Sequence, residues 1–91
     1  MVHMGKFGKL LKRFSEKPRD FTFNELKKML SHLGYDELKL GKTSGSRVAF
    51  VHRESKHIIR LHRPHPSPVL KLYQVHEIYD ELQKKGVFEK K

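Results

Sequence analysis

The side chains best suited to chemistry in this sequence are two histidines and the arginines near them. His62 and His65 flank an arginine–proline pair, and Arg47 and Arg60 lie upstream of them. Histidine can act as a general base or acid because its ordinary pKa lies near neutrality, and arginine binds phosphate through paired hydrogen bonds. Cleavage of RNA without a metal needs a base for the 2′-hydroxyl, an acid for the leaving oxygen and a cation at the phosphorus. If these side chains converge, they predict such cleavage. The alternative is that His62 and His65 only bind phosphate or cap a loop.

The spacing of two strand-like segments predicts that some of these residues do converge. Four residues separate His52 from His57, so a hairpin at this link would set these two histidines opposite each other. In the same register Arg47 lies across from His62, and directly opposed residues of antiparallel strands contact each other. We therefore predict a working centre of Arg47 and His62, with His65 close by.

The histidines do not form a metal-binding pattern. Residues 41–71 contain four histidines but only one acid, Glu54, at no compact ligand spacing. Cysteine is absent, which excludes a thiolate zinc site and a disulfide framework. No cofactor and no metal are expected, and the absence of cysteine fits a reducing compartment, the cytoplasm.

The charge of the chain indicates an anionic partner. Lys and Arg number 20 against 10 Asp and Glu, for a net charge of +10. The excess is concentrated in residues 1–19, with six bases and one acid, and in residues 41–71, with seven bases and one acid. A field focused in this way attracts a polyanion such as RNA, whereas the competing interpretation is a merely soluble basic protein. The candidate RNA-binding residues are Lys42, Ser46, Arg60, Arg63 and Lys71.

Two helices are expected in the first third of the chain. Residues 6–15 repeat apolar side chains at helical spacing opposite a basic side, which is typical of a helix packed on a domain or lying on a membrane. We favour packing and predict no membrane contact. Thr22 and Glu25 form a capping box for a second helix, residues 23–33, which Gly34 ends.

Strands and a last helix follow. The segments 35–40, 47–52 and 57–62 are predicted strands, and apolar spacing from residue 72 to Gly86 predicts the final helix. The expected fold class is α+β, a three-stranded antiparallel sheet with helices on one face and an extra N-terminal helix. The residues expected to be buried are Phe23, Leu26, Leu30, Phe50, Ile59, Leu61, Val75 and Leu82. Those expected on the outward sheet face are Arg47, Ala49, Val51, Ile58, Arg60 and His62. Tyr73 and Tyr79 are read as core residues.

Three stretches together resemble the HicA family of bacterial toxins. They are Glu25–Leu30 with Leu33-Gly34-Tyr35, then Gly45–Phe50, then Pro64-His65-Pro66 followed by Leu70-Lys71 and Lys85-Gly86-Val87. The resemblance implies a double-stranded-RNA-binding-domain-like fold, metal-independent cleavage of messenger RNA and neutralisation by a HicB-type antitoxin protein. The position of the family's catalytic histidine, directly after Gly45-Ser46, holds Arg47. Because arginine stays protonated, it cannot serve as a base, so a non-catalytic RNA-binding module on the same fold remains the alternative.

The expected organisation is a single domain with an N-terminal extension. Residues 1–5 are interpreted as a cloning remnant or disordered segment, residues 6–19 as the basic amphipathic helix and its linker, and residues 20–91 as the HicA-like RNA-binding domain.

Overall fold

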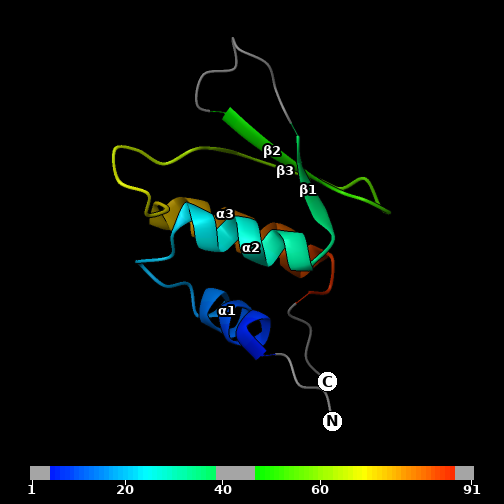
Figure 1. The fold of residues 1–91 in the computed structure, drawn as a ribbon, viewed down its shortest axis with the longest axis horizontal. Helices are drawn as coiled ribbons and strands as arrows, with labels where there is room; N and C mark the ends of the chain where they lie inside the picture. The colour runs from blue at the N-terminus through cyan, green and yellow to red at the C-terminus, as the bar shows by residue number, and fades with distance from the viewer. Residues whose placement is uncertain (1–4, 39–46, 88–91) are drawn as a thin grey trace.

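The computed structural model describes residues 5–38 and 47–87 of the chain. Figure 1 shows a sheet on one side, two helices against it and a third helix beyond them. The elements in chain order are α1 (Gly5–Ser15), α2 (Phe23–His32), β1 (Tyr35–Leu38), β2 (Arg47–His52), β3 (Ile58–His62) and α3 (Leu72–Lys84). The predicted α+β class with a three-stranded antiparallel sheet is confirmed, in the order β1-β2-β3. Residues 39–46, which include the end of the first predicted strand, lie outside the described residues.

The sheet buries one face against the helices, as its alternating pattern requires. Phe50 and Ile59 are cross-strand partners and both are 2% exposed, so the predicted inward face is correct. Leu61, predicted to be buried with them, is only half-buried at the end of the outer strand. Ala49 lies on the opposite face as predicted but is also buried, because its small side chain sits on the central strand between Leu38 and Arg60.

Local signals define α2 at both ends. The hydroxyl of Thr22 accepts a hydrogen bond from the Glu25 N–H at 3.1 Å, and the Glu25 carboxylate accepts one from the Thr22 N–H at 2.9 Å. This is the predicted capping box, and it satisfies two N–H groups that a helix start leaves free. Gly34 follows the helix with a φ of +98°, a conformation that favours glycine. A Cβ there would also lie 2.9 Å from the ring of His52, so the position is closed to larger residues.

The N-terminal helix α1 packs on the domain, which confirms the favoured interpretation. Phe14 is fully buried, and its ring meets that of Phe21 edge-on with centroids 4.9 Å apart. Arg13 donates to Glu25 at 3.1 Å, so α1 is tied to the capping box of α2. In the part of the chain that the structure describes, no helix is long and apolar enough to cross a membrane.

The helix α3 completes the core and is joined to the start of α2. The Phe23 N–H donates to the Pro68 carbonyl at 2.9 Å, so the segments that lead into the two helices lie together. Val75 and Leu82 are fully buried on α3. The prediction that Tyr73 belongs to the core is wrong, because its side chain is 57% exposed. It lies two positions before Val75, which turns it about 200° away around the helix. The other predicted core tyrosine of α3 is half-buried.

Candidate functional site

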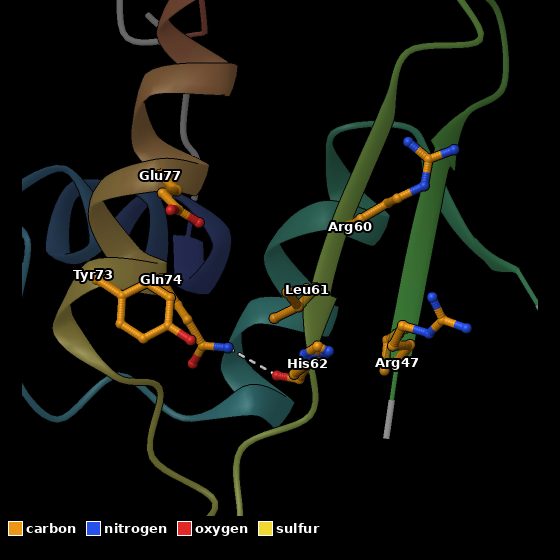
Figure 2. A pocket seen from close by; sticks show the side chains of 8 residues that line it. Arg47, Arg60, Leu61, His62, Tyr73, Gln74 and Glu77 are labelled. Carbon is orange, nitrogen blue, oxygen red and sulfur yellow. Dashed lines mark hydrogen bonds between the residues drawn. The ribbon is translucent and has the colours of Figure 1, made fainter. Parts of the chain in front are cut away.

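Arg47 and His62 lie directly opposite each other at one end of the β2–β3 hairpin. Their Cα atoms are register partners, as predicted, and Arg60 is the next residue along β3 on the same face. All three side chains are exposed. Figure 2 shows Arg47 and Arg60 projecting from the strands on the side away from α3. We call the surface that carries Arg47, Arg60 and His62 the cationic face.

The side chains of the cationic face are free for a ligand. Within the described residues, Arg47, Arg60 and His62 make no side-chain hydrogen bond or ion pair with the rest of the chain. Several other cations of the domain are committed: Arg13 and Arg53, for example, pair with Asp20 and Asp36. Arginines without an internal partner are the ones available to bind phosphate.

A groove opens beside the cationic face, between β3 and α3. It encloses about 510 Å³, and Figure 2 shows Tyr73, Gln74 and Glu77 of α3 facing β3 across it. Arg47, Arg60 and His62 line its other side. His65 lies three residues past the strand, is exposed and is not among the lining residues. The structure therefore brings Arg47, Arg60 and His62 together, and His65 follows them in the loop that leaves β3.

A buried glutamine holds the end of β3 against α3. Gln74, 4% exposed, donates through Nε2 to the His62 carbonyl at 2.8 Å, and its Oε1 accepts from the Lys71 N–H at 3.0 Å. Because these bonds fix the backbone of His62, Gln74 is a positioning residue for the cationic face. Sequence reasoning missed it, since a glutamine on a helix carries no signal of the strand it will meet.

The four histidines of residues 47–71 divide into two with structural contacts and two whose rings have no partner among the described residues. Nδ1 of His52 accepts the N–H groups of Glu54 and Ser55, each at 3.1 Å, and so closes the turn between β2 and β3. Nδ1 of His57 lies 2.6 Å from the hydroxyl of Tyr35, and its Nε2 lies 2.8 Å from the carboxylate of Glu81. This chain of three side chains joins β1, the hairpin and α3. Both ring nitrogens of His57 are therefore engaged, and Nδ1 of His52 is held by the turn.

The contacts among Tyr35, His57 and Glu81 shift the pKa values of Glu81 and Tyr35. The hydrogen bond from His57 lowers the pKa of Glu81, assisted by the charge of Lys84. Burial raises the pKa of Tyr35, and the nearby Glu81 carboxylate raises it further. Tyr35 is 3% exposed, so its hydroxyl cannot reach a substrate and the three residues serve the fold.

The remaining predicted RNA-binding residues are more scattered. The guanidinium of Arg63 stacks over Phe23 at 5.0 Å from the ring centroid and lies 3.9 Å from Glu37 on the helix side of the sheet. Lys71 is exposed at the start of α3. Lys42 and Ser46 lie outside the described residues. Over residues 5–38 and 47–87, no three acidic or histidine side chains come together in a way that would hold a metal ion.

Comparison with known proteins is consistent with the fold and gives the family of this chain. Residues 23–85 match the family described as the HicA toxin of bacterial toxin–antitoxin systems. No curated protein and no solved structure gives a significant match. The matched segment runs from the first residue of α2 past the end of α3 and leaves residues 1–22, which include α1, and residues 86–91 outside. It covers well over half of the chain and carries the double-stranded-RNA-binding-domain-like arrangement of that family, so this protein belongs to the HicA family of toxins, a family of ribonucleases.

Proposed function

We propose that this toxin binds messenger RNA on its cationic face and cleaves it by acid–base chemistry that needs no metal. The observation that carries the proposal is the direct opposition of Arg47 and His62, with Arg60 beside them and no partner for any of the three side chains among the described residues. The two arginines supply positive charge for a phosphate, and the histidine supplies a base for the ribose hydroxyl next to that phosphate.

In the proposed reaction His62 removes the proton of a ribose 2′-hydroxyl. The 2′-oxygen then bonds to the adjacent phosphorus while the bond from phosphorus to the 5′-oxygen breaks, which leaves a 2′,3′-cyclic phosphate and a 5′-hydroxyl. Arg47 and Arg60 stabilise the charge that develops on the phosphorane. An acid must protonate the leaving oxygen, and His65 in the loop after β3 is the free histidine next along the chain. His62 suits the base better, because a strand holds it more rigidly than a loop holds His65.

The second candidate function is RNA binding without cleavage. It is favoured by one observation, the arginine at position 47, where the family has its catalytic histidine. One assay separates the two functions: the purified protein is incubated with a single-stranded messenger RNA and a chelator, and the products are analysed. Fragments ending in a cyclic phosphate support cleavage, whereas binding with intact RNA supports the second candidate.

Membership of a toxin–antitoxin family implies a cognate antitoxin. We assign this role to a HicB-type protein of acidic character, since a net charge of +10 attracts an acidic partner as well as RNA. Co-expression tests this assignment: an acidic HicB-type protein encoded beside the toxin gene should restore growth and co-purify with the toxin.

A further inference from the structure

The strand β3 leaves one edge of the sheet open, and its backbone groups point outward there. The sheet order places β3 at an edge of the described structure. The His52 N–H donates to the His57 carbonyl at 2.9 Å, so this pair is hydrogen-bonded. Bonded and non-bonded pairs alternate along an antiparallel ladder, and every second residue of β3 therefore turns its N–H and C=O away from β2. These residues are Ile58, Arg60 and His62.

One contact supports this direction independently. The carbonyl of His62 accepts its hydrogen bond from Gln74 of α3, which lies beyond the outer edge. Among the described residues, the outward N–H and C=O of Ile58 and Arg60 have no partner in the chain. Both residues are exposed, so these groups are open to a ligand.

A groove follows the whole of this edge. The cavity of about 510 Å³ beside His62 and a second one of about 400 Å³ toward Ile58 share Arg60 and Glu77 among their lining residues. The inner side chains are apolar, with Leu61 in the first cavity and Ile78 in the second. An extended chain laid along β3 would therefore find both backbone partners and an apolar surface.

The charges on the α3 side of the groove distinguish its occupants. Glu77, Asp80 and Glu81 line that side together with Lys84, whose ammonium group lies 3.8 Å from the Glu81 carboxylate. Within the described residues Glu77 and Asp80 form no ion pair, although the protein carries a large positive charge. Carboxylates repel the phosphates of RNA, so the groove itself is unsuited to nucleic acid. On the other side of the edge Arg60 points to the cationic face.

We propose that the edge of β3 is a docking site for an extended segment of a partner protein, which adds to the sheet as a fourth strand. Side chains alternate across such a strand. Those that turn toward α3 would be apolar or basic, to match Ile78, Glu77 and Asp80. Those that turn toward the cationic face would be acidic, to pair with Arg60. Strand addition uses main-chain hydrogen bonds for affinity and alternate side chains for specificity.

Such a segment would also compete with RNA, because its acidic side chains would occupy the arginines that bind phosphate. This consequence rests on the proposed function, whereas the docking itself does not. The two are therefore tested separately.

The probe for docking is a synthetic peptide that alternates glutamate with leucine and lysine. Its binding is followed through the backbone amide signals of the isotopically labelled full-length protein, without RNA. We expect the largest shifts at Ile58, Arg60 and His62. A peptide of the same composition with its acidic residues in one block should bind at least about tenfold more weakly, the equivalent of about one hydrogen bond.

Two matched comparisons test strand pairing and charge. N-methylation of the peptide amides that face β3 should abolish binding, whereas N-methylation of the alternate amides should not. Glu77→Lys should weaken binding about tenfold, while Glu54→Lys, the same change in the exposed hairpin turn, should leave it unchanged. The proposal is overturned if the two methylated peptides bind equally, or if millimolar peptide shifts none of the three amides. It is also overturned if the signals of those amides change with protein concentration, which would indicate a second copy of the protein in the groove. The same holds if an RNA oligonucleotide shifts the signals of those amides together with the signals of Glu77 and Asp80.

Competition is then measured as RNA affinity with and without the peptide. Displacement of RNA supports the link to the proposed function. Peptide binding with unchanged RNA affinity would leave the docking site in place and overturn only the competition.

Discussion

Replacement of Gln74 by leucine is expected to loosen the joint between β3 and α3. Leucine has a similar size and suits a site that is 4% exposed, but it makes neither of the two hydrogen bonds of the glutamine. Each such bond contributes about 1 kcal/mol net, and a buried group left without a partner costs about 1–3 kcal/mol. Because His62 is exposed, water can replace part of the bond to its carbonyl. We therefore expect the free energy of unfolding to fall by about 2 kcal/mol, which corresponds to a decrease in Tm on the order of 10 °C for a domain of this size.

Urea denaturation of Gln74→Leu at neutral pH measures this loss, and Gln83→Leu on the exposed side of the same helix is the matched control, expected within about 0.5 kcal/mol of wild type. Gln74→Glu adds a signed test. Its ionised carboxylate can accept from Lys71 but cannot donate to His62, whereas the protonated acid can. Burial would raise the pKa of this acid, so its stability relative to wild type should recover as the pH falls. Equal stability of Gln74→Leu and Gln83→Leu would refute the role of the glutamine.

The remaining predictions concern catalysis, salt, pH and the N-terminal helix. His62→Ala and Arg47→Ala should each reduce RNA cleavage about a hundredfold without unfolding the protein. His76→Ala, on the exposed side of α3, should leave cleavage unchanged. Cleavage at the wild-type rate by the His62 variant would contradict the mechanism. RNA affinity, measured by titration at several salt concentrations, should fall steeply as salt rises, and a flat response would contradict phosphate binding. The bond from His57 lowers the folded-state pKa of Glu81, so the stability it contributes is present above the ordinary value of 4.5 and is lost as pH falls through the lower folded value. Denaturation at a series of acidic pH values should therefore show that the free energy of unfolding falls less steeply with pH for Glu81→Gln than for wild type. Phe14→Ala should cost about 3–5 kcal/mol by denaturation, because Phe14 is fully buried; a loss below 1 kcal/mol, on the order of a surface change, would mean that α1 is dispensable.

Much of the architecture could be predicted from local patterns. The capping box of Thr22 and Glu25 and the glycine at position 34 define α2, because helix ends have chemical requirements that a few adjacent residues meet. The alternation of apolar residues identified the buried face of the sheet, since side chains on a strand change sides at every residue. The link between His52 and His57 set the hairpin register and with it the opposition of Arg47 and His62.

The sequence was less informative wherever a side chain meets a distant element. Tyr73 is of a residue type often found in a core, yet its position around α3 turns its side chain to the surface. Gln74 looks like an ordinary helix-surface residue and is buried, because its partner is the carbonyl of His62 on β3. Arg63 stacks on Phe23 of α2, a contact with a distant element that its place in the sequence does not indicate.

The histidines illustrate the same division most clearly. By type and spacing, His52 and His57 were as suited to chemistry as His62, and the sequence determined only that the first two face each other across a turn. The packing of α3 against the hairpin decided the use of His57, because it brought Glu81 to one side of its ring while β1 brought Tyr35 to the other. A histidine whose two ring nitrogens are both engaged has none left for a substrate. For His62, the described part of the chain engages the backbone carbonyl and not the ring, which leaves the ring open to a substrate.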